Sequence, residues 1–203
     1  MSSIAIVVGV PGVGKTTIIS KAIEKLRNLG YQAEIINYGD VMLMKAVELG
    51  YVKNRDEMRK LPITKQLYLQ RVAAEWISKK SEEVDLILLD THLFIRTPRG
   101  RWPGLSENNI PYLKGIVQLI LIEADPHDIS FRRQRDKTRI RSDYGDVKEI
   151  DEDQIFNRYL SASISIKYGC PVYILVNEEG KIPEVVEKLV KVLENIIIDS
   201  KVE

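Results

Sequence analysis

The sequence has little of what metal centres, disulfide-stabilised domains and membrane proteins require. Its 203 residues include one cysteine, Cys170, and two histidines, His92 and His127, which excludes an internal disulfide, a cysteine-based zinc site and a histidine-rich metal centre. No apolar stretch approaches the roughly 20 residues of a membrane-spanning helix, and no basic region precedes the first apolar run as in a signal peptide. We therefore expect a cytoplasmic protein without a membrane partner, and a lone free cysteine is typical of that reducing compartment.

The chain also lacks an excess of charge of either sign. Its 30 Lys and Arg residues balance 29 Asp and Glu residues, so the formal net charge is +1, whereas nucleic-acid-binding domains are usually plainly basic. We therefore do not expect a nucleic-acid partner, although a local basic patch is compatible with this balance. At roughly 150 residues per domain, the length predicts one domain, residues 1–203, with room for an inserted subdomain.

Apolar runs rich in β-branched residues alternate with helical patterns along the chain. Runs typical of buried parallel strands cover residues 4–8, 33–36, 86–90, 117–122 and 172–176. This alternation predicts an α/β fold with a doubly wound, five-stranded parallel sheet. We expect Asp40 to cap a helix, a further helix over residues 151–168, and a loop over residues 97–104, which hold two prolines and two glycines.

The strongest motif lies between the first strand and the first helix. Residues 9–16 read Gly-Val-Pro-Gly-Val-Gly-Lys-Thr and match G-x-x-x-x-G-K-[ST] in full. Glycines let successive backbone N–H groups turn toward a phosphate, and the helix that follows adds its N-terminal partial positive charge. Lys15 can reach the β- and γ-phosphates, and the Thr16 hydroxyl can bind Mg²⁺. The motif therefore predicts binding of a nucleoside triphosphate.

Asp90 ends the third predicted strand, where P-loop proteins usually place an acidic partner for the metal. It can bind Mg²⁺ through water or orient the P-loop. The alternative is a helix cap or a structural carboxylate on the loop at Thr91.

A cluster of basic residues follows the fourth strand. Six cations and one acid, Asp136, fall within ten residues, and such a density of positive charge repels itself unless an anion is bound. A transferring phosphoryl group is such an anion, and arginine binds it bidentately. Helical spacing places Arg132, Arg135 and Arg139 on one face and leaves Arg133 on another, where we expect it to be solvated. Arg141 follows in a predicted loop, and residues 132–145 are expected to form a lid; the alternatives are a solvated face or a nucleic-acid patch.

A second basic set points to an acceptor. Arg96 lies just past the carboxyl end of the third strand, where α/β sheets place ligands, and we predict that it binds an acceptor phosphate. Arg55 and Arg59 are one helical turn apart, and their segment fits a solvated helix start equally well.

Together these blocks resemble the nucleoside monophosphate kinases, most closely the archaeal-type adenylate kinases. The matching segments run in order over nearly the whole chain and cover residues 9–17, 37–40, 55–61, 90–92, 95–98, 123–126, 135–136, 138–139, 141–144 and 176–177. The resemblance implies Mg²⁺-dependent, reversible phosphoryl transfer from ATP to AMP, an acceptor region near residues 38–75, a short lid and a homotrimer.

The resemblance also implies roles for individual residues. Lys15, Arg135, Arg139 and Arg141 would surround the transferring group, and Thr16 and Asp90 would hold the metal. The ATP-binding set would be Gly9, Val10, Pro11, Gly12, Val13, Gly14, Lys15, Thr16, Thr17 and Asn177, with Asn177 near the base. The AMP-binding set would be Asp40, Arg55, Arg59, Thr91, His92 and Arg96.

Two departures from the bacterial-type pattern are evident. The arginine of Gly-Asp-Met-Leu-Arg has no counterpart after Gly39 and Asp40, so its role would move to Arg55 or Arg59. The long zinc-binding or β-rich lid is absent as well. A kinase for UMP, CMP or dTMP, and an ATP-dependent assembly factor that binds RNA or protein, are the alternative functions.

Overall fold

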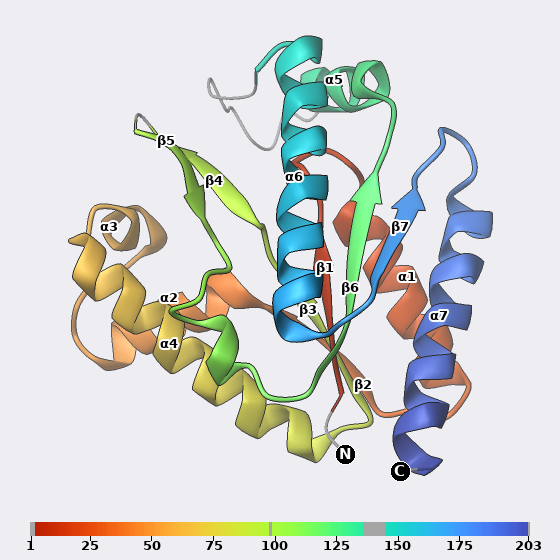
Figure 1. Ribbon diagram of the computed structural model, residues 1–203, viewed down its shortest axis with the longest axis horizontal. Helices are drawn as coiled ribbons and strands as arrows, with labels where there is room; N and C mark the ends of the chain where they lie inside the picture. The colour runs from red at the N-terminus through yellow and green to blue at the C-terminus, as the bar shows by residue number, and fades with distance from the viewer. Residues whose placement is uncertain (1–2, 98, 136–144, 203) are drawn as a thin grey trace.

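The computed structural model describes residues 3–97, 99–135 and 145–202 and confirms the predicted sheet (Figure 1). Its strands lie in the order β2-β3-β1-β6-β7, and every neighbouring pair is parallel. They are β1 (Ile4–Val8), β2 (Ala33–Asn37), β3 (Leu86–Asp90), β6 (Ile116–Glu123) and β7 (Val172–Val176).

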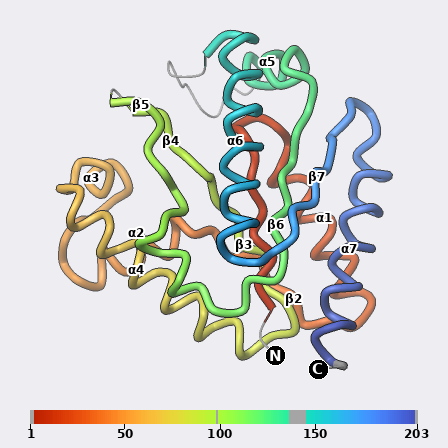
Figure 2. The backbone as a smooth tube through the Cα atoms, in the orientation of Figure 1, coloured from red at the N-terminus to blue at the C-terminus, as the bar shows by residue number. Residues whose placement is uncertain are grey.

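Helices cover both faces of this sheet (Figure 1). They are α1 (Lys15–Asn28), α2 (Tyr38–Glu48), α3 (Arg55–Arg59), α4 (Ile63–Lys80), α5 (Pro126–Arg135), α6 (Val147–Tyr168) and α7 (Ile182–Val202), with the 3₁₀ helices η1 (Ser81–Glu83) and η2 (Ile110–Tyr112). Within the described residues, no helix combines the length and the apolar character needed to cross a bilayer. Figure 2 shows that β1 starts and α7 ends at the end of the molecule opposite to the β1–α1 loop.

Alternation of side chains along the strands divides the core between the two faces. Val7 of β1 and Leu88 of β3 belong to a buried cluster with residues of α1 and α7. Their chain neighbours Ile6 and Leu89 belong to a second cluster with residues of α2 and α4. The five strand residues of β1 are fully buried, as expected for a strand covered on both faces.

The acceptor region predicted over residues 38–75 has a small core of its own. Ala46 of α2, Val52, Met58 of α3 and Leu69 of α4 form a separate buried cluster. This cluster fixes α2, α3 and α4 to one another at one side of the sheet (Figure 1).

The expectation of a loop over residues 97–104 is wrong. Two short antiparallel strands, β4 (Phe94–Thr97) and β5 (Gly100–Pro103), form a hairpin there, with Ile95 opposite Trp102. Of the glycines and prolines that suggested a loop, Gly100 and Pro103 stand at the ends of β5 and Gly104 follows it, so they bound the strand without interrupting it, while Pro98 lies outside the described residues. Contacts with α6 stabilise the hairpin, since the rings of Phe94 and Phe156 pack edge to face with centroids 5.2 Å apart.

Two predicted helix starts are also corrected. Asn37, and not Asp40, caps α2, because the Asn37 side chain accepts a hydrogen bond of 3.1 Å from the Asp40 N–H. Helix α6 begins before residue 151 with a capping box, in which Asp146 accepts from the Glu149 N–H and Glu149 accepts from the Asp146 N–H.

This capping box gives a stability prediction. Asp146→Ala removes the acceptor for the Glu149 N–H, so the free energy of unfolding should fall by about 1 kcal/mol. Urea titration followed by circular dichroism measures the change. The control is Asn195→Ala on the exposed side of α7, which should change stability by at most a few tenths of a kcal/mol; equal losses in both variants would contradict the role of the cap.

Candidate functional site

The P-loop joins β1 to α1 and is shaped by glycines at two positions. Gly12 and Gly14 have φ angles of 87° and 91°, in the left-handed region that side chains disfavour. Gly14 immediately precedes α1, so the loop leads into the N-terminus of a helix of 14 residues. The local geometry is therefore that of an anion-binding loop.

Lys15 is buried at the base of this loop, with 8% of its surface exposed. Its ammonium group forms an ion pair with Asp90 Oδ1 and donates a hydrogen bond of 3.0 Å to the Thr91 carbonyl oxygen. Burial lowers the pKa of Lys15, and the Asp90 carboxylate opposes that shift. The structure thus brings together Lys15, predicted for the ATP site, Asp90, predicted for the metal, and the backbone of Thr91, predicted for the acceptor.

Asn37 continues this network toward the acceptor region. Asn37 and Asp90 are register partners at the ends of β2 and β3, and Asn37 Nδ2 donates to Asp90 Oδ2 at 3.0 Å. Asn37 also caps α2, whose Asp40 forms an ion pair with Arg55. Arg59 instead faces solvent and contacts Asp56 at 3.4 Å. A polar chain therefore runs from Lys15 to Arg55 and does not include Arg59.

The outer side of the P-loop is held by donors from two other elements. Asn177 Nδ2 donates to the Val13 carbonyl oxygen at 2.7 Å, and Arg132 Nη1 donates to the same oxygen at 3.3 Å. Arg133 Nε donates to the Pro11 carbonyl oxygen at 2.8 Å, so the expectation that Arg133 is solvated is wrong. Asn177 is 2% exposed, and its side chain is directed at the loop.

Arg96 lies on the hairpin and is directed at α6. Its Nε donates to Asp153 at 2.7 Å, its Nη1 to Glu149 at 2.8 Å and its Nη2 to the Glu149 carbonyl oxygen at 3.1 Å. The hydrogen bond from Arg96 to Asp153, together with Glu149, raises the pKa of Arg96 despite partial burial. Arg101 also pairs with Asp153, at 2.9 Å, so one buried carboxylate holds two guanidinium groups.

The other predicted residues are placed as follows. Thr16 and Thr17 are exposed on the first turn of α1, and His92 is half-buried between β3 and β4. Arg135 is exposed at the end of α5, with its guanidinium 5.3 Å from the centre of the Phe131 ring. Arg139 and Arg141 lie outside the described residues.

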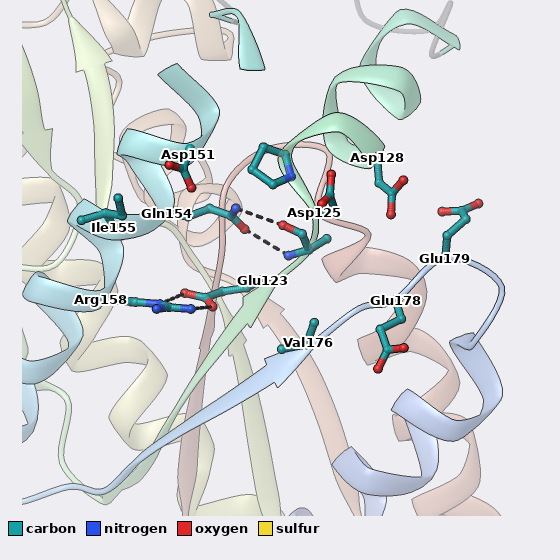
Figure 3. Close-up of a pocket in the computed structure, with 12 residues that line it drawn as sticks. Glu123, Asp125, Asp128, Asp151, Gln154, Ile155, Arg158, Val176, Glu178 and Glu179 are labelled. Carbon is teal, nitrogen blue, oxygen red and sulfur yellow. Dashed lines mark hydrogen bonds and ion pairs between the residues drawn. The ribbon is translucent and has the colours of Figure 1, made fainter. Parts of the chain in front are cut away.

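A separate hollow of about 440 Å³ lies beside α6 and β7, and none of the P-loop residues line it (Figure 3). Its walls carry acidic side chains around Gln154, Ile155, Val176 and Arg158: Glu123, Asp125, Asp128, Asp151, Glu178 and Glu179. Arg158 engages both oxygens of Glu123, at 2.7 and 2.6 Å. The excess of carboxylates disfavours a polyphosphate, so the P-loop is the candidate nucleotide site.

Sequence reasoning missed the roles of Asn37 and Arg133. Asn37 ends β2 as Asp90 ends β3, and polar residues at strand ends were the available signal. That signal becomes specific only when β2 is known to lie beside β3. For Arg133 no signal was available, because spacing within a helix does not show which neighbour each face meets.

Comparison with known proteins agrees with this geometry. The chain is 48% identical to an adenylate kinase of Sulfurisphaera tokodaii over 179 residues, which cover 87% of this chain and 92% of that protein. It is 41% identical to an adenylate kinase of Methanopyrus kandleri over 196 residues, which cover 97% of this chain and 100% of that protein. The chain belongs to the adenylate kinase family.

Two broader comparisons place the family in its fold. A family model described as an AAA domain matches residues 8–151. A shikimate kinase structure from Bacteroides thetaiotaomicron superposes with a TM-score of 0.55 at 16% identity and covers 95% of this chain and 98% of that one. This adenylate kinase chain therefore has the fold of small P-loop kinases.

The double ion pair at Asp153 gives a second prediction. Asp153→Ala leaves Arg96 and Arg101 without their shared buried acceptor, so the free energy of unfolding should fall by about 2 kcal/mol. Chemical denaturation measures it. Asp56→Ala, which removes the exposed partner of Arg59, is the control and should cost at most about 0.5 kcal/mol. An Asp153→Ala variant as stable as that control would show that the hairpin does not depend on this carboxylate.

Proposed function

We propose that the protein catalyses reversible transfer of the γ-phosphoryl group of ATP to AMP, giving two molecules of ADP. The observation that carries this proposal is the buried Lys15–Asp90 pair at the P-loop, linked through Asn37 to the helices of the acceptor region. The names of the relatives that share up to 48% of the sequence support it.

Mg²⁺ is the metal we propose, and the donor set fits it. Mg²⁺ is commonly bound by one or two carboxylates together with substrate phosphates and water. Thr16 on the first turn of α1 and Asp90 at the end of β3 offer one hydroxyl and one carboxylate. No group of three or more acidic, histidine or cysteine side chains suited to a metal occurs among the described residues, in agreement with a metal that arrives with ATP. Bound there, Mg²⁺ would neutralise phosphate charge.

On the ATP side, the P-loop N–H groups and Lys15 would hold the phosphates. Asp90 keeps the Lys15 ammonium at the base of the loop, and the phosphates would then share that cation. Arg135, with Arg139 and Arg141 as the resemblance implies, would stabilise charge on the transferring group.

On the acceptor side, Arg96 and Arg55 are the proposed phosphate ligands. A guanidinium has five N–H donors, and Arg96 directs three of them at α6, which leaves two for a phosphate. Arg55 belongs to the network that includes Asp40 and Asn37, and we therefore propose it in preference to Arg59. Thr91 and His92 follow β3 and would face the acceptor.

The reaction needs no covalent intermediate. An α-phosphate oxygen of AMP attacks the γ-phosphorus in line, the bond to the β,γ-bridging oxygen breaks, and ADP leaves with that electron pair. The protein contributes position, positive charge and exclusion of water, since water would otherwise be the acceptor.

We further propose that the protein is a homotrimer, as the resemblance implies. Helix α6 exposes Tyr159 and Ile166 at 69% and 87%, and the edge strand β7 exposes Ile174 and Val176. Ile155 of α6 and Val176 of β7 both line the hollow beside these two elements (Figure 3). A partner chain would bury this apolar surface and cap the free edge of the sheet.

The first test of function is an acceptor panel. ADP formation from ATP and Mg²⁺ should be at least about tenfold faster with AMP than with UMP, CMP or dTMP at matched concentration. Lys15→Met should lower turnover by about 100-fold or more, because a positive charge on the phosphates is lost. A higher rate with another monophosphate would reassign the acceptor, and acceptor-independent hydrolysis stimulated by RNA or protein would replace the kinase proposal.

The second test is the molar mass in solution. Size-exclusion chromatography with light scattering should give about 70 kDa, three times the chain mass of 23.2 kDa. Tyr159→Asp and Ile166→Asp would place charges on the apolar surface and should lower the mass to that of one chain. Lys188→Asp on α7 is the control that should leave the trimer intact. A single-chain mass for the unmodified protein would contradict the proposal.

A further inference from the structure

The orientation of the P-loop carbonyl groups determines which backbone N–H groups face the phosphate side of the loop. A peptide unit is planar and trans, so the carbonyl of one residue and the N–H of the next point in opposite directions. A donor that binds the Val13 carbonyl from outside therefore turns the Gly14 N–H inward. A donor on the Pro11 carbonyl does the same for the Gly12 N–H.

Asn177 binds the first of these peptide groups, between Val13 and Gly14, through its side-chain amide. Its Nδ2 lies 2.7 Å from the Val13 carbonyl oxygen, and its own backbone N–H donates to the Glu123 carbonyl oxygen at 2.7 Å. A Cβ atom at Gly14 would stand 2.4 Å from Asn177 Nδ2, so glycine gives the amide room to reach the loop. The side chain is buried, and the backbone N–H of the residue anchors it to the end of β6.

Arg133 acts on the second peptide group from another element. Its Nε donates to the Pro11 carbonyl oxygen at 2.8 Å, and a Cβ atom at Gly12 would meet its side chain at 2.9 Å. The two peptide groups before Gly12 and Gly14 are thus held from outside. Arg133 of α5 binds the one before Gly12, and Asn177 of the β7–α7 loop binds the one before Gly14 at 2.7 Å, with Arg132 Nη1 on the same oxygen at the longer distance of 3.3 Å.

Because glycines stand at positions 12 and 14, the loop needs side-chain donors on its carbonyl groups to fix the orientation of its peptide groups. Gly12 and Gly14 lack the steric restriction that would keep neighbouring peptide groups in one orientation. A reversed peptide group would present a carbonyl oxygen, and not an N–H, to the phosphates. Within the described part of the chain, the N–H groups of Gly12 and Gly14 have no hydrogen-bond partner, so they are available to a ligand.

We propose that Asn177 and Arg133 are positioning residues for the phosphate cradle: they bind the Val13 and Pro11 carbonyls from outside and so direct the Gly14 and Gly12 N–H groups at the ATP phosphates. The proposal rests on the proposed function only in taking ATP as the ligand. It assigns Asn177 a role at the polyphosphate of ATP, whereas the resemblance to adenylate kinases placed this residue near the nucleobase.

The experiment follows the two glycine amides separately by NMR in the full-length protein labelled with ¹⁵N-glycine. In the unmodified protein, ATP should move both amide protons downfield, because both N–H groups donate to phosphate. Asn177→Leu, which keeps a similar shape without an N–H, leaves only the longer hydrogen bond from Arg132 on the Val13 carbonyl. It should therefore strongly reduce the shift of Gly14 and retain that of Gly12. Arg133→Met should have the reverse effect.

Steady-state kinetics give a second readout. Each variant should raise KM for ATP by about tenfold, as expected for loss of one hydrogen bond, and should leave KM for AMP within about twofold. A general loss of stability would not separate the two substrates in this way. Asn109→Leu is the matched control, because Asn109 is a buried amide that donates to the Gly104 carbonyl at 3.0 Å. It should lower the thermal midpoint without moving the Gly14 shift.

Equal responses of Gly12 and Gly14 in both variants would overturn the proposal, since loss of the Arg133 charge alone acts on the whole cradle. Unchanged shifts and an unchanged KM for ATP would overturn it as well. If Asn177→Leu does not fold, the Arg133→Met variant alone tests the proposal, because it alters a partly exposed side chain. An unmodified protein that binds ATP but does not phosphorylate AMP refutes the proposed function and leaves this inference standing.

Discussion

Most of the candidate site depends on one buried ion pair between Lys15 and Asp90. A buried ammonium group is costly without a counter-ion, and a buried carboxylate is equally costly, so each residue requires the other. Because Lys15 begins α1 and Asp90 ends β3, the pair fixes the phosphate loop to the carboxyl edge of the sheet. Asn37 then ties the same carboxylate to α2, so the P-loop and α2 share one charge.

Several arginines around the candidate site and the neighbouring hollow are already paired with carboxylates. Arg132 pairs with Glu179, Arg96 and Arg101 share Asp153, Arg55 pairs with Asp40, and Arg158 engages Glu123. Phosphates that enter the site would have to compete with carboxylates already in place, which favours ligands of high charge such as polyphosphates.

The sheet and the phosphate loop could be predicted from the sequence because both depend on local signals. The inner strands β1 and β3 are buried throughout and read as continuous apolar runs, and the partly buried edge strands β2 and β7 have similar runs. The loop needs its glycines, lysine and threonine at fixed spacing. Tertiary contacts decided the rest. The hairpin exists because Phe94 meets Phe156 and two arginines meet Asp153, and neither contact is visible in the spacing of residues 94–103. Likewise, helical periodicity separated the faces of α5 but could not show that Arg133 faces the P-loop.

The division of the core by the sheet bears on how such a kinase can change over time. Ile6 and Val7 are adjacent in the chain, yet one packs under the acceptor helices and the other under α1 and α7. Substitutions more than about 7–10 Å apart that share no partners usually have additive effects. Substitutions in the cluster under α2 and α4 should therefore combine additively with substitutions in the cluster under α1 and α7 wherever the side chains share no neighbours, so each face of the sheet can change its packing while the other keeps its own.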